Sequence, residues 1–130
     1  MALPVPITAI YASLLGLFIF ALAIRVVRLR RAHHIGIGDG GNKDLLRAIR
    51  IHGNAIENVP VALLLLLVYE LNHGSPQLLH AFGSLLFFAR VMHAWGLSGS
   101  AGMSIGRLGG VVGTWLTIVG LGVVNLLKLF

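Results

Sequence analysis

Four polar side chains recur at helical spacing in the segment RAIRIHGNAIENVP, residues 47–60. Arg47, Arg50, Asn54 and Glu57 fall within an arc of roughly 80° on one helix face, since each residue advances a helix by about 100°. The apolar run VALLLLLVYEL follows directly, so this helix enters a lipid bilayer. A charge near the bilayer centre costs about 2.5–3.5 kcal/mol. Protein or a water-filled cleft must therefore cover the polar face.

A second apolar segment, FFARVMHAW, adds Arg90 and His93, one helical turn apart. Glu57 is the expected ion-pair partner of Arg90, because a buried arginine and a carboxylate satisfy each other. Two interpretations remain open. The pair could only join two helices, or several arginines could converge with Asn54 and Glu57 on a small ligand. Such a ligand would carry several negative charges, which arginines bind, and an amine, which Glu57 would bind.

The composition indicates that these residues belong to a membrane protein. The chain has 130 residues, of which 57% are hydrophobic and 11% charged, against about 25% charged in soluble domains. One domain over residues 1–130 is expected. The absence of cysteine excludes disulfides and thiolate metal sites, and we expect no metal. The net charge of +6 does not indicate nucleic acid, because the basic residues flank apolar segments without a nucleic-acid-binding motif.

Four stretches are long and apolar enough to cross a bilayer as helices. They cover residues 3–27, 44–71, 76–97 and 105–129, and their short connections predict an all-α, up-down four-helix bundle in the membrane. The basic run after residue 27 is expected to end the first helix, and Asn42 or Asp44 to cap the second. His80 is expected to form a hydrogen bond between helices.

The fourth stretch carries small residues at the spacing of close helix packing. The pairs are 106/110, 109/113 and 110/114, and the packing could be within one subunit or between subunits. Basic residues gather around the first connection and are missing from the second. By the positive-inside rule, the first and third connections are cytoplasmic and both termini lie outside.

The pattern R-x2-R-x3-N-x2-E-x2-P at residues 47–60, followed by the apolar run, resembles the signature of the MAPEG family, the membrane-associated proteins in eicosanoid and glutathione metabolism. The basic end of the first helix and the FAR triplet at residues 88–90 extend the resemblance over nearly the whole chain. It implies a homotrimer, with glutathione bound as co-substrate between subunits near the cytoplasmic side. A bacterial-type member would lie in the inner membrane, in contact with membrane lipids.

The resemblance also implies roles for single residues. Arg30 and His52 match positions that touch the glycyl end of glutathione, and Arg50, Asn54 and Glu57 match those that hold its γ-glutamyl end. Arg90 matches a structural arginine. Two further positions, at which other family members more often have tyrosine, are occupied by Asn58 and His93. Arg107 is the candidate for the arginine that stabilises the thiolate, because a cation beside a thiol raises its ionised fraction.

Three functions remain open from the sequence, and a fourth, transport, is disfavoured because four helices without internal repeats offer no obvious pathway. The first is a glutathione transferase, with or without peroxidase activity, that acts on hydrophobic electrophiles or lipid hydroperoxides. The second is a non-catalytic protein that binds a lipid or another small anion in the same cleft between subunits. The third is a purely structural bundle. The sequence does not identify the electrophile.

Overall fold

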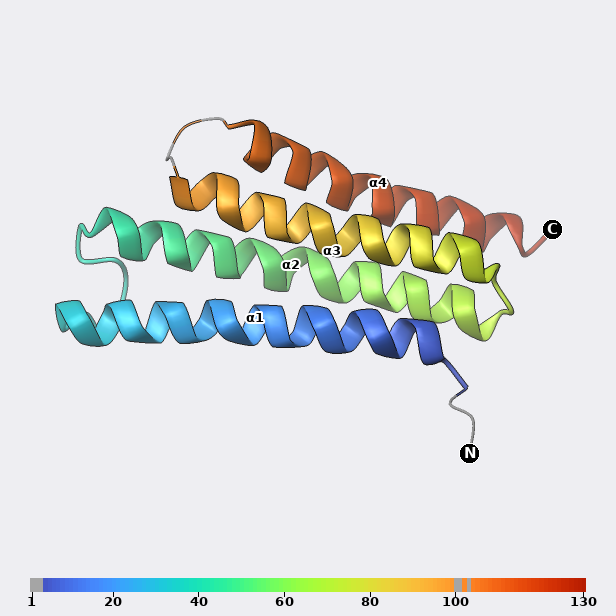
Figure 1. Cartoon of the computed structure of the whole chain (residues 1–130), viewed down its shortest axis with the longest axis horizontal. Helices are drawn as coiled ribbons and strands as arrows, with labels where there is room; N and C mark the ends of the chain where they lie inside the picture. The colour runs from blue at the N-terminus through green and yellow to red at the C-terminus, as the bar shows by residue number, and fades with distance from the viewer. Residues whose placement is uncertain (1–3, 100–101, 103) are drawn as a thin grey trace.

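The computed structural model describes residues 4–99, 102 and 104–130. The chain forms four helices, α1 (Pro6–His33), α2 (Lys43–Leu71), α3 (Pro76–Gly99) and α4 (Ile105–Leu127). Figure 1 shows that they alternate in direction, so that the start of α1, the α2–α3 turn and the end of α4 share one end of the bundle. Each helix is long and apolar enough to span a membrane. The predicted all-α, up-down four-helix bundle is confirmed.

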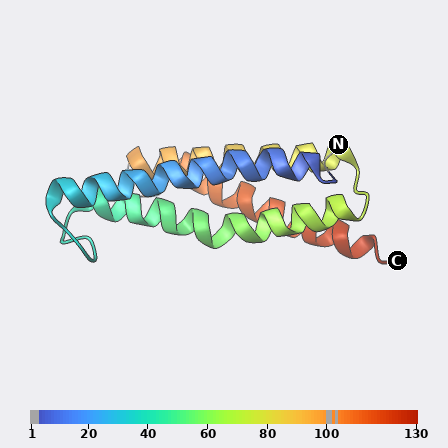
Figure 2. The same ribbon diagram turned by 90° about the horizontal axis from the view of Figure 1, so that it is seen from below.

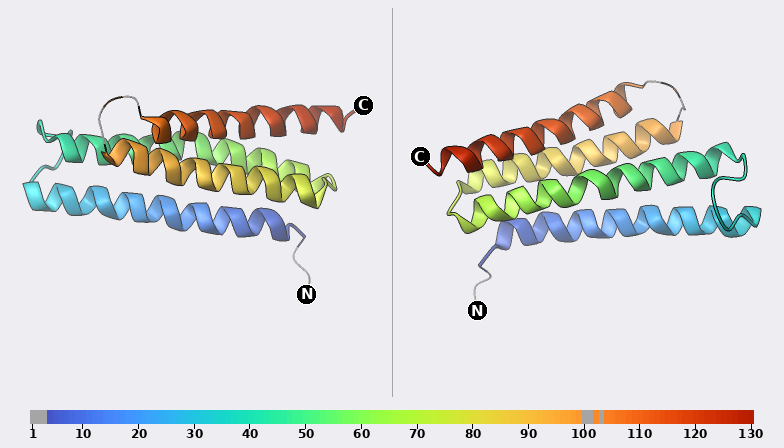
Figure 3. Two further views of the ribbon diagram at one scale, coloured as in Figure 1. Left: turned by 45° about the horizontal axis from the view of Figure 1, so that its top comes forward. Right: turned by 180° about the vertical axis from the view of Figure 1, so that it is seen from behind.

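The helices are arranged so that α2 and α3 form the centre of the bundle. Each of these two contacts all three other helices, whereas α1 and α4 make no contact with each other among the described residues. Figures 2 and 3 show α1 and α4 on opposite sides of the α2–α3 pair. The contact between α3 and α4 is the most extensive. A polar face on α2 can therefore be covered by α3 and α4 together.

The end of α1 differs from the prediction. The helix continues through the basic run to His33 instead of ending at residue 27, because arginine is a good helix former and charge alone does not stop a helix. It ends where His34 adopts a left-handed conformation (φ 54°). The N–H groups of His34 and Ile35 bond to the carbonyls of Arg31 and Arg30, respectively. The predicted start of this span, Leu3, lies outside the described residues.

The other helix boundaries agree more closely with the sequence. Asn42, one of the two expected caps of α2, accepts a hydrogen bond from the Leu45 N–H through Oδ1 (2.9 Å). Pro76 begins α3, which ends at Gly99 rather than residue 97. Ser104 caps α4 by accepting from the Arg107 N–H (3.2 Å), and α4 ends at Leu127 rather than residue 129.

Glycines allow α3 and α4 to approach closely. A Cβ atom on Gly110 would stand 2.5 Å from the His93 Cβ atom, and one on Gly96 would stand 2.5 Å from the Arg107 backbone nitrogen. Gly113 packs in the same way against Ala89. The small-residue face of α4 is thus used for packing within one subunit, a choice that the sequence left open.

The end of the bundle opposite the first connection holds a separate set of polar contacts. Glu70, at the end of α2, accepts hydrogen bonds from the backbone N–H groups of Ile7 (2.9 Å) and Thr8 (2.6 Å) at the start of α1. The carboxylate therefore caps a helix more than 60 residues away in the chain. His80 contacts the Tyr11 hydroxyl through Nδ1 (3.1 Å), which confirms the expected bond between helices.

Candidate anion site between α2, α3 and α4

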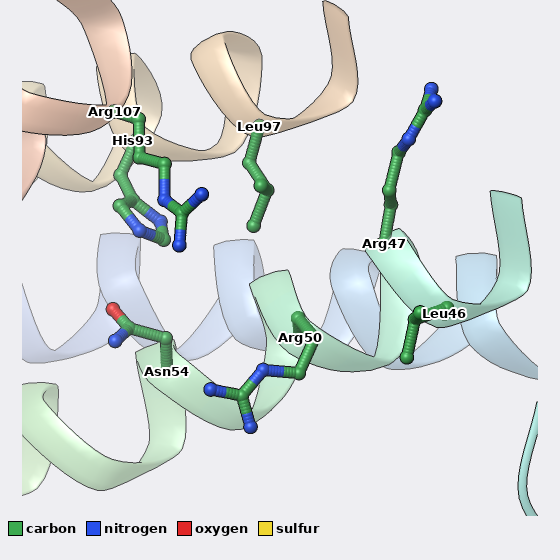
Figure 4. Close-up of a pocket in the computed structure, with 7 residues that line it drawn as sticks. All are labelled: Leu46, Arg47, Arg50, Asn54, His93, Leu97 and Arg107. Atoms are coloured by element: carbon green, nitrogen blue, oxygen red, sulfur yellow. The ribbon is translucent and has the colours of Figure 1, made fainter. Parts of the chain in front are cut away.

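A cavity of about 190 Å³ opens between three helices, near the end of the bundle that holds the first and third connections. Figure 4 shows the side chains around it: Arg47, Arg50 and Asn54 project from α2, His93 and Leu97 from α3, and Arg107 from α4. Leu46 completes the lining. Three of these seven residues are arginines, and no carboxylate of the described residues lines the cavity. The arrangement fits a negatively charged ligand.

The rotation of α2 about its own axis brings Arg47, Arg50 and Asn54 to the cavity. The opposite face of α2 is buried through Leu45, Ala48, Ile51 and Ala55, which fixes the rotation of the helix. Arg47 and Arg50 then stand on the side that faces α3 and α4, so the cover that the sequence required comes from these two helices. In the view of Figure 4, the Arg47 guanidinium is directed away from that of Arg50. Arg47 lies 3.7 Å from the Asp44 carboxylate through Nη1.

The beginning of α4 brings Arg107 to the cavity. The Ser104 hydroxyl caps α4 and also donates to the Gly96 carbonyl (3.1 Å), which fastens the first turn of α4 to α3. Since Gly96 and Gly106 have no side chains, the two backbones lie in contact at this point. Arg107 therefore lies in the first turn of α4, where the helix dipole adds positive potential to that of the guanidinium.

Arg90 is the centre of a polar junction that joins the same three helices. Its side chain is 1% exposed, and it donates to Asn54 Oδ1 on α2 (2.7 Å), to Thr114 Oγ1 on α4 (3.3 Å) and to His93 Nδ1 (3.2 Å). An arginine can only donate, so His93 Nδ1 must accept. The imidazole therefore carries its proton on Nε2. Arg90 thus fixes both Asn54 and His93, two walls of the cavity.

The expected ion pair between Arg90 and Glu57 is wrong for this chain. Asn54, one turn earlier on α2, takes the position beside the Arg90 guanidinium, and Glu57 is exposed. Both residues nevertheless line a second cavity of about 250 Å³. Asn54, Asn58 and Thr114 line it as well, so Asn54 forms a wall between the two cavities. Asn58 is held by a hydrogen bond from Nδ2 to the Asn54 carbonyl (2.9 Å).

Two residues implied by the resemblance line neither cavity. Arg30 donates through Nη1 to the carbonyls of Gly36 (3.2 Å) and Gly38 (2.9 Å), so its guanidinium holds the first connection against α1. His52 is half-buried and lies on a different face of α2 from Arg50 and Asn54. Within the single chain the structure therefore brings together Arg50, Asn54, His93 and Arg107, with Glu57 and Asn58 in the adjoining cavity.

The structure adds Thr114 and Leu97 to the residues found by the sequence. Thr114 was assigned only to the small-residue pattern of α4, yet its hydroxyl accepts from Arg90 and donates to the Gly110 carbonyl (2.8 Å). The sequence signal for this role was spacing, because Thr114 follows Gly110 by four residues and therefore lies on the same face of α4. No group of three histidine, aspartate or glutamate side chains among the described residues is arranged to hold a metal ion.

Fold and composition together define an integral membrane protein with an arginine-lined cavity in a four-helix bundle. The sequence pattern of the MAPEG family matches residues 8–127, and the chain belongs to this family. Inner membrane protein YecN of Escherichia coli strain K12 is 36% identical over 120 residues, covering 92% of this chain and 90% of that protein. The protein of the same name from Escherichia coli O6:H1 has the same identity and coverage.

Proposed function

We propose that the protein is a membrane-bound glutathione transferase that presents the glutathione thiolate to hydrophobic electrophiles or lipid hydroperoxides. The observation that carries this proposal is the cavity between α2, α3 and α4, which is lined by three arginines and by no carboxylate of the described residues. Glutathione carries two carboxylates, one amine and one thiol, and it therefore suits such a site. Membership of the MAPEG family supports the same ligand.

The two adjoining cavities match the two kinds of charge in the γ-glutamyl end. Arg50 would bind its carboxylate through paired hydrogen bonds, and Glu57 would bind its ammonium group. Asn54, which borders both cavities, would contact the peptide between them. His93, with its proton on Nε2, can donate a further hydrogen bond.

A single subunit supplies too little surface to enclose the tripeptide. The cavity of about 190 Å³ is smaller than the roughly 300–1,000 Å³ of typical ligand sites, and Arg50 and Glu57 are exposed on the chain. An exposed charge at membrane depth needs further cover. We therefore propose a homotrimer in which a neighbouring subunit closes the site, and in which Arg30 and His52 can contact the peptide only across that boundary.

Arg107 would activate the glutathione thiol. A free thiol has a pKa of about 8.5, and the guanidinium at the first turn of α4 favours its thiolate form. In the transferase reaction the sulfur attacks the electrophilic carbon, a C–S bond forms, the leaving group departs with its electron pair, and the thiol proton passes to water. In the peroxidase reaction two thiols reduce the hydroperoxide to an alcohol and water and become a disulfide.

We place the protein in the bacterial inner membrane, with the first and third connections in the cytoplasm and both termini outside. The first connection carries the basic residues that orient membrane proteins, and the relative with 36% identity is named an inner membrane protein. The cavity would then face the cytoplasm, where glutathione is available.

Two measurements on purified protein in detergent test the function. Thermal unfolding with increasing glutathione reports binding, because a ligand of the native state raises the unfolding temperature. Conjugation to a chloronitrobenzene, or reduction of a lipid hydroperoxide, reports catalysis. We expect both. If calorimetry detects no glutathione binding and neither reaction exceeds the uncatalysed rate, the proposal is refuted.

The second candidate is a non-catalytic binding protein. The exposed arginine-lined cavity fits an anion whether or not a reaction follows, and Asn58 and His93 replace tyrosines that are frequent in the family. Tight glutathione binding without turnover, or a co-purified lipid displaced by Arg50→Ala, would favour this function.

A further inference from the structure

The end of α1 extends beyond the hydrocarbon region of the bilayer. Its 28 residues, at about 1.5 Å each, give a length of about 42 Å, whereas the hydrocarbon core is about 30 Å thick. The first charge after the apolar run is Arg25, so the last two turns of α1 lie at the lipid headgroups and beyond. Figure 1 shows α1 and α2 extending past α3 and α4 at this end.

A groove of about 320 Å³ lies on this projecting part, between α1 and the first connection. Val27 and Ile35 provide its apolar surface, and Arg31 and His34 provide exposed basic side chains. Arg30 also lines the groove, but its guanidinium is occupied by the loop carbonyls. Val27 is nearest to the bilayer, and Arg31 stands about 6 Å further out along the helix. The groove is therefore apolar through Val27 at its end toward the lipid, and Arg31 and His34 line it further out.

The charges around the groove favour an anion. The exposed basic residues Arg31 and His34 line it, and others lie outside it at the same end of α1: Arg25, Arg28 and His33. The nearby acidic side chains are engaged by their own neighbours. Asp39 accepts from the Gly41 N–H (2.8 Å), and Asp44 lies beside Arg47.

The connection also exposes an apolar residue where lipid headgroups are expected. Ile37 is 95% exposed between Gly36 and Gly38, in a loop whose position Arg30 fixes by hydrogen bonds to its carbonyls. An isoleucine at this level can enter the headgroup region, which removes it from water.

We propose that this groove binds an anionic phospholipid. The lipid phosphate contacts Arg31 and His34, and one acyl chain leaves along Val27 toward the bilayer. The site is separate from the cavity between α2, α3 and α4, and the proposal does not depend on glutathione binding. Charge complementarity and the order of apolar and basic residues along α1 both favour a lipid over a soluble anion.

The test is native mass spectrometry of the whole protein in detergent, titrated with phosphatidylglycerol or with phosphatidylcholine of the same acyl chains. We expect phosphatidylglycerol to bind more tightly. Arg31→Gln should weaken it about fivefold, the usual contribution of one basic residue near an anionic lipid surface. Arg28→Gln is the matched control, because it removes the same charge from an exposed position of α1 outside the groove, and it should change binding less than twofold.

A second variant tests the acyl-chain contact. Val27→Ser should weaken long-chain phosphatidylglycerol while leaving a short-chain form unchanged, and circular dichroism should show unchanged helix content in all variants. Equal effects of Arg31→Gln and Arg28→Gln would overturn the proposal, since the attraction would then be general. Equal affinity for the two headgroups, or displacement of the lipid by millimolar glycerol phosphate, would overturn it as well.

Discussion

Replacing Asn54 should destabilise the bundle, because it removes the shortest hydrogen bond of a buried cation. Arg90 is 1% exposed and donates to Asn54 Oδ1 at 2.7 Å, with longer bonds to Thr114 and His93. Hydrogen bonds to charged groups contribute about 1.5–3 kcal/mol in soluble proteins, whereas those between membrane helices average about 0.6 and reach about 1.7 kcal/mol. We expect Asn54→Ala to cost about 1.5 kcal/mol, where the two ranges meet.

A second substitution at the same position should not reduce stability, which separates loss of the hydrogen bond from a general effect of replacing Asn54. Asn54→Asp keeps the acceptor and adds the negative charge that Arg90 lacks, so it should be at least as stable as the parent protein and clearly more stable than Asn54→Ala. Thr114→Val removes only the 3.3 Å bond and should cost less than Asn54→Ala. The free energy of unfolding is measured by circular dichroism during titration of mixed micelles with sodium dodecyl sulfate.

A double-mutant cycle assigns the effect to the pair. Arg90→Met removes the cation at similar volume, and in its presence Asn54→Ala should cost little, giving a coupling energy of about 1.5 kcal/mol. If Asn54→Ala leaves stability unchanged, or if the coupling is below about 0.5 kcal/mol, then Arg90 does not depend on Asn54. The account of the junction would then be refuted.

Three further predictions concern other parts of the molecule. Glu70→Ala should cost about 1 kcal/mol, as loss of a helix cap does, and should speed hydrogen exchange at the first turn of α1; unchanged exchange there would contradict the cap. Gly110→Ala should cost about 1–3 kcal/mol through overpacking, since its Cβ atom would stand 2.5 Å from the His93 Cβ atom. Its control, Gly109→Ala, meets only the end of the Met92 side chain at 3.3 Å and should change stability by less than about 0.5 kcal/mol; similar losses would argue against tight packing at Gly110. Arg107→Ala should lower kcat by about tenfold or more and raise KM by less than threefold, measured by conjugation kinetics, because Arg107 acts on the thiolate; the reverse pattern would reassign it to binding.

The sequence was sufficient to predict which residues share a face, but not which partners they meet. Hydropathy and spacing placed Arg47, Arg50 and Asn54 together, and all three line one cavity. Arg90 was assigned to Glu57 because charge complementarity was the only guide to its partner. The relative rotation and height of α2 and α3 decide between residues one turn apart, and these depend on packing along the whole length of both helices.

Two other features were beyond the sequence for a related reason. The basic run was expected to end α1, yet arginine is compatible with a helix, and the actual end depends on the left-handed His34 and the loop that follows. No partner of Glu70 was predicted, because the carboxylate binds backbone N–H groups at the start of another helix. Residue types do not indicate which backbone groups a side chain will bind, so such partners are found only in the folded structure.

Several charges in this protein are satisfied by neutral groups, and this helps to explain why both proposed ligands are anions. Glu70 binds backbone N–H groups, Lys128 donates to the carbonyls of Asn72 and His73, and Arg90 donates to neutral side chains. Such hydrogen bonds satisfy donors and acceptors without cancelling the net charge of +6. The excess positive charge is concentrated where α1 ends and α2 begins, at the level of the lipid headgroups, where anionic lipids attract basic residues. Since the described residues offer one ion pair there, between Arg47 and Asp44, this positive charge can attract anions from outside the chain.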